Sequence, residues 1–449
     1  MDEKAADCDC IFCKDMHEFK IPNELLEELL SGKVTLFSGA GISTESRAVL
    51  KTTFYESVAL ESGNLIHNLK FPELMEMYCS QPNGRLKLLK KIKDRFDHID
   101  SFPELVKRAT RFHRELGTLY PIKNIVTTNW DTYFERFCKA TPFVTDSDLA
   151  FWEAANRRVL KIHGSISNYG SIVATTQDYL QSQDRLSIEM IGSVLKTILA
   201  TQTVIFIGYS LTDSDFLAIY EFVKKQMKSL HKQAYVVTPI AEDCERFKEA
   251  GLIPIKTDGT YFLSQIKAHA VTQGAMIPDD VFDSASEFHF RVFREHQLLH
   301  DSVKLKDFPE VMFAASYQDG LLHALERAIE MKGSGEYSHR CDIQRVIDSY
   351  IKWQETKLQQ GIYEDVAYIE GYVNGLVFLL MSKEERVEGS PPLYFMFGAK
   401  SDIYDLDEFM EQIHLNPKAA EEPHKRALRY LDRLTGDPTR IEFHHPPWL

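Results

Sequence analysis

Short apolar runs alternate with helical patterns along residues 21–272 of the chain. Runs that lack alternation of polar and apolar positions are typical of strands in a parallel sheet covered on both faces. In the helical patterns, apolar residues recur three and four positions apart. This rhythm predicts an α/β fold. We expect its strands at residues 34–37, 123–127, 159–162, 204–207, 235–238 and 252–255.

Two stretches depart from this alternation. Residues 53–116 carry helix-like segments over a length that is too great for a simple connection, so we expect a helical insertion there. From about residue 285 to residue 449, apolar stripes recur at helical spacing, as at Ile343, Val346 and Ile347. These stripes predict a mainly α-helical C-terminal domain.

The chain thus divides into three parts: a Cys-rich leader at residues 1–20, the α/β part at 21–272 and the helical part at 285–449. We place the boundary between the last two parts at residues 274–283. That stretch contains Gly, Pro and acidic residues and shows little periodicity, which is typical of a connecting segment.

Composition narrows the classes of function. The 449 residues include 52 Lys and Arg against 66 Asp and Glu, a net charge of −14, which argues against general nucleic-acid binding. No apolar run approaches the roughly 18 residues of a membrane helix, and the N-terminus lacks the apolar core of a signal peptide. Seven cysteines in so long a chain do not make a disulfide framework. We therefore expect a cytoplasmic protein with no membrane attachment.

A Gly-rich segment, SGAGIS at residues 38–43, directly follows the first expected strand. Gly39 and Gly41 permit a tight turn and a close backbone approach, and peptide N–H groups with the following helix end can hold a diphosphate. A sharp strand-to-helix turn without a ligand is the structural alternative. Thr44 stands where the dinucleotide fingerprint has its third glycine, so a plain dehydrogenase is poorly supported.

Two polar motifs follow the next strands, at the carboxyl ends where open α/β sheets bind ligands. Asn129 has a donor and an acceptor for a ribose hydroxyl or a water, whereas Asp131 has the alternative of capping the next helix. His163 is positioned as a general base, with a structural role as its alternative, and Gly164 keeps the space beside it open.

The fourth motif is IGYSLTDSD at residues 207–215. Gly208 permits a close approach, Ser210 offers a hydroxyl and Asp213 can cap a helix. The motif indicates either the second half of a nucleotide cleft or another strand–helix turn with an acidic cap.

Together and in this order, the four motifs resemble the sirtuin, or silent-information-regulator, family over residues 24–270. The resemblance implies a Rossmann-like parallel sheet that binds NAD. It implies the catalytic residues His163, Asn129 and Asp131, and the NAD-binding residues Ser38, Gly39, Ala40, Gly41, Ile42, Ser43, Thr128, Gly208 and Ser210.

The chain also departs from the protein-deacylating sirtuins. No Cys lies between Cys138 and Cys244, so the deacylase zinc module is missing. TTFYE at residues 52–56 replaces the Pro-Asp-Phe-Arg stretch of that branch, which weakens the case for a protein-lysine tunnel. The chain is instead similar to the bacterial sirtuin-like proteins of antiviral defence, which hydrolyse NAD and thereby stop phage propagation.

This resemblance implies an NAD glycohydrolase that releases nicotinamide and ADP-ribose in antiphage defence by abortive infection. It also implies a homo-oligomer and an activating partner protein or phage trigger, with residues 285–449 serving as a sensor or oligomerisation domain. Breaking the nicotinamide–ribose bond builds positive charge on the ribose carbon. Asn129 would orient the ribose and a water, His163 would accept a proton, and Asp131 would engage the nicotinamide amide or stabilise the charge.

Two other functions stay open. One is an NAD-dependent protein deacylase or ADP-ribosyltransferase, against which the missing zinc module counts. The other is a non-catalytic NAD or ADP-ribose sensor, although pure binding does not need a base such as His163.

The leader holds three cysteines and a histidine within ten residues. A tetrahedral zinc site is one interpretation, although the spacing CxCxxC differs from the usual Cys pair. Reduced thiols in a mobile tail are the alternative. The candidate zinc ligands are Cys8, Cys10, Cys13 and His17.

Overall fold

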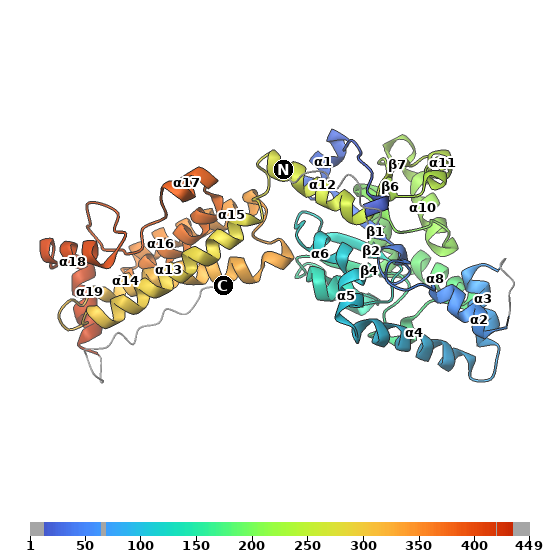
Figure 1. Ribbon diagram of the computed structural model, residues 1–449, viewed down its shortest axis with the longest axis horizontal. Coiled ribbons are helices and arrows are strands. Elements are labelled where there is room, and N and C mark those ends of the chain that lie inside the picture. The colour runs from blue at the N-terminus through green and yellow to red at the C-terminus, as the bar shows by residue number, and fades with distance from the viewer. Residues whose placement is uncertain (1–12, 64–68, 419, 434–449) are drawn as a thin grey trace. The chain divides into compact units, whose positions relative to one another are not determined.

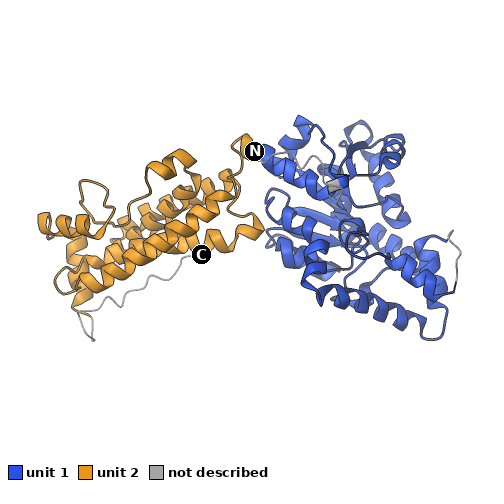
Figure 2. Ribbon diagram, viewed as in Figure 1, with its two compact units in different colours: residues 1–270 blue, residues 271–449 orange. Residues whose placement is uncertain are grey.

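The computed structural model describes residues 13–63, 69–418 and 420–433. The chain forms two compact units, Met1–Ala270 and Val271–Leu449, which we call unit 1 and unit 2 (Figure 2). The division lies just before the stretch 274–283, where the sequence places the domain boundary. Cys8 and Cys10 lie outside the described residues.

Unit 1 is built on a seven-stranded sheet in which all neighbouring strands are parallel (Figure 1). Every residue of the four central strands is buried except in β4, where Arg158 is half-buried. This burial is expected for a sheet covered on both faces and confirms the predicted Rossmann-like α/β fold. The strands are β1 (Val34–Ser38), β2 (Asn124–Thr127), β3 (Thr141–Phe143), β4 (Arg158–Lys161), β5 (Thr203–Ile207), β6 (Tyr235–Thr238) and β7 (Ile253–Lys256).

The order of the strands is β3-β4-β2-β1-β5-β6-β7. Strands β2, β3 and β4 thus lie on one side of β1, and the later strands β5, β6 and β7 lie on the other side. The connections that leave β1 and β5 therefore lead to opposite sides of the sheet, and a crevice at the carboxyl ends of the strands is expected at this point. The register pairs Leu36 of β1 with both Ile125 of β2 and Ile205 of β5. This places the ends of the three strands, and the polar motifs after them, at one edge of the sheet.

The six strands predicted from the sequence are present, with ends shifted by at most one residue. Strand β3 is the one that the pattern misses. It has only three residues, two of them not fully buried, and it contains Pro142. Proline is tolerated there because β3 lies at the edge of the sheet, where one side needs no backbone donor.

Five helices occupy the predicted insertion between β1 and β2. The first begins at Thr53, whose hydroxyl accepts from the N–H of Glu56 while Glu56 caps the N–H of Thr53 in return. Apolar residues of the first three helices, such as Val58 and Ile92, form a small core of their own. The helices are α2 (Phe54–Glu61), α3 (Phe71–Cys79), α4 (Gly84–Asp100), α5 (Pro103–Ala109) and α6 (Arg111–Gly117).

The remaining helices of unit 1 flank the sheet (Figure 1). The first of them, α1, buries Leu25, Leu26 and Leu29, and Gly32 at φ +70° turns the chain from this helix toward β1. These helices are α1 (Asn23–Leu30), α7 (Tyr133–Cys138), α8 (Thr176–Ile188), α9 (Met190–Thr201), α10 (Ser214–Met227), α11 (Ala241–Glu249) and α12 (Gly259–Thr272).

Unit 2 is helical, as predicted. Its helix α13 begins at Asp280, inside the stretch where the sequence suggests a connecting segment, and α14 is buried over most of its surface. The helices are α13 (Asp280–Ser302), α14 (Val311–Glu330), α15 (Arg340–Gln359), α16 (Tyr363–Leu380), α17 (Lys383–Glu388), α18 (Leu406–Leu415) and α19 (Glu421–Leu431).

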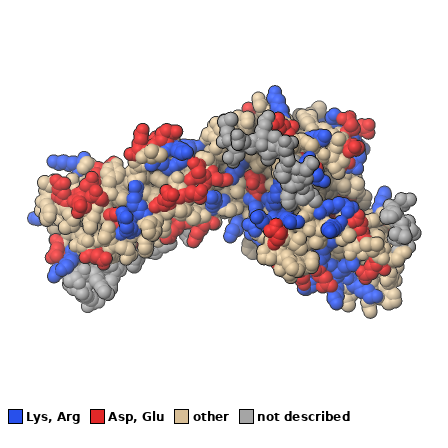
Figure 3. Space-filling model, in the orientation of Figure 1, with Lys and Arg blue, Asp and Glu red and all other residues tan. Residues whose placement is uncertain are grey.

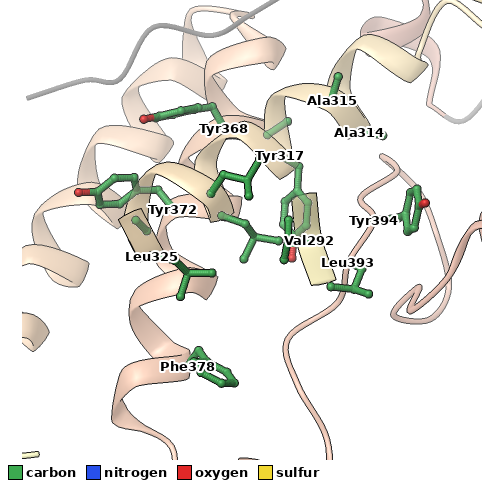
Figure 4. Packing of buried hydrophobic residues seen from close by; sticks show 14 of the residues in the cluster. Val292, Ala314, Ala315, Tyr317, Leu325, Tyr368, Tyr372, Phe378, Leu393 and Tyr394 are labelled. Atoms are coloured by element: carbon green, nitrogen blue, oxygen red, sulfur yellow. The ribbon is translucent and has the colours of Figure 1, made fainter. Parts of the chain in front are cut away.

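Helices α14 and α16 pack against each other through glycines. A Cβ atom at Gly371 would lie 1.8 Å from the carbonyl oxygen of Tyr317, and one at Gly320 would lie 2.0 Å from that of Tyr368. The two backbones therefore approach more closely than any side chain would allow. Tyr317, Tyr368 and Tyr372 fill the surrounding core (Figure 4).

The surface carries charges of both signs. On the face drawn in Figure 3, basic side chains are interspersed with acidic ones on each unit. Among the described residues, no helix is both long and apolar enough to cross a membrane.

Candidate active site

A cavity of about 390 Å³ opens at the carboxyl ends of the central strands of unit 1. Its volume is within the range of about 300–1,000 Å³ that is usual for small-molecule sites. The four predicted motifs, which are far apart in the sequence, all contribute to its walls. The residues from these motifs are Gly39, Ala40, Gly41, Thr128, Asn129, Asp131, His163, Gly208 and Ser210.

Three predicted site residues lie outside the walls of this cavity. Ser38 is the buried last residue of β1, and its carbonyl oxygen accepts a hydrogen bond from the Thr127 hydroxyl at 2.9 Å. Ile42 lines a second cavity of about 170 Å³, whose walls share Gly41 and Gly208 with the first. Ser43 is buried behind the wall of the first cavity.

The two glycine loops contact each other directly. The N–H of Gly39 donates to the carbonyl of Ile207 at 3.2 Å, and the N–H of Gly41 donates to the carbonyl of Gly208 at 3.1 Å. The prediction that peptide N–H groups of this segment hold a diphosphate therefore concerns other N–H groups than these two. They are satisfied between the loops, and only a three-residue 3₁₀ turn, Ala40–Ile42, follows Gly39.

Asn129 is held at the cavity by its neighbours. Its N–H donates to the Thr127 hydroxyl at 3.0 Å, and its side-chain amide donates to the Ser43 hydroxyl at 3.5 Å. The side-chain oxygen Oδ1 is buried and has no hydrogen-bond partner among the residues that the structure describes. A buried acceptor without a partner is costly, so this atom suits a hydroxyl group of a bound ligand or a water.

Asp131 lies on the same wall and is almost fully buried. One carboxylate oxygen accepts from the backbone N–H of Tyr133, the first residue of α7, at 3.1 Å, and the other accepts from Ser43 at 3.3 Å. The helix-capping alternative is therefore present in the structure. Burial raises the pKa of the Asp131 carboxyl above its ordinary value, although the charge of Lys161 acts in the opposite direction.

His163 follows β4 and has only 3% of its surface exposed. Its ring nitrogen Nε2 lies 3.0 Å from a carboxylate oxygen of Asp215 on α10. Burial lowers the pKa of His163, whereas the Asp215 charge and hydrogen bond raise it, and the net direction is upward. For Asp215, burial raises the pKa and His163 lowers it, and the net direction is downward.

Asp213 supplies a second carboxylate near His163, and this residue lines the cavity. Asp213 stands at the N-cap position of α10, but its side chain makes no capping bond, so the capping prediction is wrong. Instead, Asp213 accepts a hydrogen bond from the Tyr179 hydroxyl at 2.7 Å. The Tyr179 ring lies 5.0 Å from the His163 ring, measured between centroids. His163 is thus enclosed by an aromatic ring and two carboxylates.

The helical insertion at residues 53–116 supplies one wall of the cavity, and this wall was not predicted from the sequence. Arg95 of α4 pairs with Glu45 at 3.0 Å and donates to the carbonyl of Thr44 at 2.8 Å, and both charged side chains line the cavity. Phe54 of α2 packs against Trp130 with ring centroids 5.9 Å apart. No spacing in the sequence connects α4 with the first loop, because about fifty residues separate them and only packing of the insertion brings them together.

Metal ligands do not gather in the part of the chain that the structure describes. Across residues 13–63, 69–418 and 420–433, no three His, Cys, Asp or Glu side chains are grouped so as to hold a metal ion. The backbone of His17 exchanges hydrogen bonds with the Thr257 hydroxyl at 3.2 and 2.9 Å. The predicted zinc site depends on Cys8 and Cys10, and so it lies outside the described residues.

Comparison with known proteins agrees with this geometry. Residues 123–255 match the family model of the SIR2-like domain. This stretch contains Asn129, His163 and Gly208, and it begins after the first glycine loop. The predicted resemblance to the sirtuin family is confirmed, and the match covers residues 123–255 of unit 1.

Curated relatives match about half of this chain. The chain is 26% identical over 233 residues to Defense-associated sirtuin 2 of Bacillus subtilis, covering 48% of this chain and 22% of the relative. It is 26% identical over 220 residues to the NAD(+) hydrolase ThsA of Enterococcus faecium, covering 47% of this chain and 44% of the relative. It is 25% identical over 242 residues to the NAD(+) hydrolase ThsA of Cytobacillus dafuensis, covering 50% of this chain and 47% of the relative.

The chain therefore spans less than half of the length of each of these relatives. Their names confirm the predicted similarity to defence-associated sirtuins and NAD hydrolases.

Proposed function

We propose that unit 1 hydrolyses NAD to nicotinamide and ADP-ribose. The observation that carries this proposal is the meeting of His163, Asn129 and Asp131 in the walls of one cavity, beside the two glycine loops. The likeness to proteins named NAD(+) hydrolase supports it. The protein's residues also fit the substrate, because the unpartnered Oδ1 of Asn129 offers an acceptor to a ribose hydroxyl.

The chemistry assigns one role to each of the three residues. Asn129 orients the ribose and the attacking water, and His163 accepts a proton from that water. The water oxygen bonds to the ribose carbon as the bond to the nicotinamide nitrogen breaks, and the bonding electron pair leaves with neutral nicotinamide. Asp131, the third residue, lies where it can engage the nicotinamide amide or stabilise the charge that develops on the ribose.

The remaining NAD contacts fall to the loops. Gly39, Ala40, Gly41 and Thr128 line the side of the cavity that would hold the diphosphate, and Gly208 with Ser210 lines the side that would hold the adenosine. Gly41 and Gly208 border both cavities, and the backbone hydrogen bond between them joins the two loops there.

The biological proposal follows from the activity. Depletion of NAD in the cytoplasm would halt phage propagation by abortive infection, and the protein would thereby act in antiphage defence. Such an enzyme needs control, and we assign that control to unit 2, through homo-oligomer assembly or through an activating partner protein or phage trigger. The apolar core of unit 2 makes it a separate packed body that is suited to such a role.

The leader adds a separate structural proposal. Cys8, Cys10, Cys13 and His17 would bind one zinc ion, with the backbone of His17 anchored on Thr257. Elemental analysis of protein purified without added metal tests this proposal, with Cys10→Ser as the control. Wild-type protein that contains no zinc would contradict it.

Product analysis discriminates between the functions. Purified chain is incubated with NAD, with and without an acylated peptide, and the products are separated by chromatography. Nicotinamide and ADP-ribose without peptide support hydrolysis. Nicotinamide release that requires peptide would instead indicate a deacylase or ADP-ribosyltransferase, and bound but intact NAD would indicate a sensor.

A further inference from the structure

Asp215 is a fully buried carboxylate beside the candidate base. It is the second residue of α10, and three groups bond to it. The Ser182 hydroxyl of α8 donates to Oδ2 at 2.7 Å, the backbone N–H of Phe216 donates to Oδ1 at 2.9 Å, and Nε2 of His163 lies 3.0 Å from Oδ2. These contacts come from different elements, so the position of the carboxylate is fixed from several sides.

The contact between His163 and Asp215 decides which ring nitrogen of His163 can accept a proton. An ionised carboxylate only accepts hydrogen bonds, so the ring nitrogen that faces Asp215 must carry hydrogen. In the neutral ring, the other nitrogen, Nδ1, then has the free lone pair. His163 lines the cavity, so this lone pair is available for a proton from a bound reactant.

We propose that Asp215 is the positioning residue that holds His163 in the Nε2–H tautomer, with Nδ1 as the base of the reaction. The inference rests on the NAD hydrolysis proposed above. When Nδ1 takes a proton from the attacking water, the imidazolium ion forms beside the Asp215 carboxylate. The carboxylate keeps its charge throughout and stabilises the cation, and the proton later passes to solvent.

Several other groups act on His163. Asp213, which precedes α10, raises its pKa together with Asp215, and Arg185 of α8 lowers it. Tyr179 of α8 faces the ring but is bonded to Asp213. Asp215 is the group in direct contact with the ring, so its replacement is expected to produce the largest change in the titration of His163.

The kinetic test uses Asp215→Asn, which keeps the shape of the side chain and removes the charge. We expect kcat for NAD cleavage to fall by about 100-fold or more with KM close to the wild-type value. The acidic limb of the pH profile of kcat/KM should move to lower pH, because His163 loses the anion that favours its protonated form. The matched control is Asp342→Asn in unit 2, where Asp342 lies 3.0 Å from His339; it should leave kcat and the pH profile unchanged.

A spectroscopic test needs neither catalysis nor a folded Asp215 variant. Full-length protein with ¹⁵N-labelled histidine is titrated by NMR, and the His163 signal is assigned by its loss in His163→Gln. Above its pKa, His163 of the wild-type protein should show the Nε2–H tautomer. The Nδ1–H tautomer would overturn the proposal, even if Asp215→Asn fails to fold.

The outcomes separate the two proposals. Wild-type kcat and an unshifted pH profile in folded Asp215→Asn would overturn the positioning role and leave NAD hydrolysis standing. A wild-type protein that does not cleave NAD but shows the Nε2–H tautomer, with a lowered His163 pKa in Asp215→Asn, would refute the hydrolase and support the His163–Asp215 coupling.

Discussion

Gly41 and Gly208 hold the two glycine loops in backbone contact. The N–H of Gly41 donates to the carbonyl of Gly208 at 3.1 Å, and a Cβ atom at position 41 would approach that carbonyl oxygen to 2.9 Å. Gly208 itself has φ +63°, which favours glycine. The two glycines are therefore needed for the loops to meet at the switch point of the sheet, between β1 and β5.

The first prediction is that Gly41→Val disrupts this contact. The branched side chain would force the loops apart, at a cost of about 1–3 kcal/mol in stability, and it would distort the wall of the cavity that Gly41 lines. Calorimetry with NAD should show weakened binding. Gly170→Val is a suitable control, because the nearest atom to a Cβ there lies at 3.5 Å. Unchanged NAD affinity in Gly41→Val would show that the ligand does not approach this loop.

His163→Ala and Asn129→Ala should each lower NAD cleavage by roughly 100- to 10,000-fold, since one removes the base and the other the group that orients the ribose. Circular dichroism should show an intact fold in both. The control His289→Ala alters a histidine that pairs with Glu326 in unit 2, and should be fully active. Wild-type turnover in either folded site variant removes that residue from the mechanism.

Stability should depend on pH through His163 and Asp215. His163 has a raised pKa in the folded state, so its contribution is complete below its unfolded pKa of about 6.5 and is lost as the pH rises through the folded pKa. Asp215 has a lowered pKa, so its contribution is present above its unfolded pKa of about 3.9 and is lost as the pH falls through the folded pKa.

The pair therefore stabilises unit 1 most between about pH 4 and pH 6.5. The difference in unfolding temperature between wild type and Asp215→Asn should be largest in that window and should shrink toward pH 9. A difference that is constant across this range would mean that the two groups do not titrate as a pair.

Gly371→Ala should destabilise unit 2. Its methyl group would lie 1.8 Å from the carbonyl oxygen of Tyr317, so α14 and α16 would have to separate, at a cost of about 1–3 kcal/mol or more. Gly333→Ala is the matched control, because a Cβ there has no neighbour within 4 Å. Thermal unfolding of the two variants measures the difference, and equal unfolding temperatures would contradict the close packing of these helices.

Short apolar strands made most of the fold predictable. β1 and β5 are short apolar runs in the sequence, which predicts buried strands. The site was expected at the motifs after them, because ligands bind at the carboxyl ends of parallel strands. The contact of Asp215 with His163 was not predicted, because the motif indicated either a nucleotide cleft or a turn capped by Asp213, and neither interpretation involves Asp215. Its contact with His163 joins the end of β4 to the start of α10, and no spacing in the sequence encodes that distance.

Arg95 was missed for a related reason. Its helix belongs to the insertion, where apolar periodicity predicts helices but not the face that meets the first loop. Burial against Glu45 brings the guanidinium to the cavity, and this depends on how α2, α3 and α4 pack around residues such as Ile92.

A chain that ends at Thr272 should keep the fold of unit 1, because all the proposed catalytic residues precede Ala270. Light scattering and NAD assays on this chain and on the full chain then test the proposed role of unit 2. We expect a change in oligomer size or in the response to a trigger. Identical size and identical regulated activity would contradict a regulatory unit 2, whereas a chain that cannot fold would contradict the boundary.

The hydrolysis of NAD is tested most directly by product analysis of the full chain without any peptide. NAD is incubated with the purified protein, alone and with extract of phage-infected cells, and the products are separated by chromatography. Our account predicts equal amounts of nicotinamide and ADP-ribose, with both lost in His163→Ala. NAD that stays intact under both conditions, or cleavage that persists in His163→Ala, would contradict it.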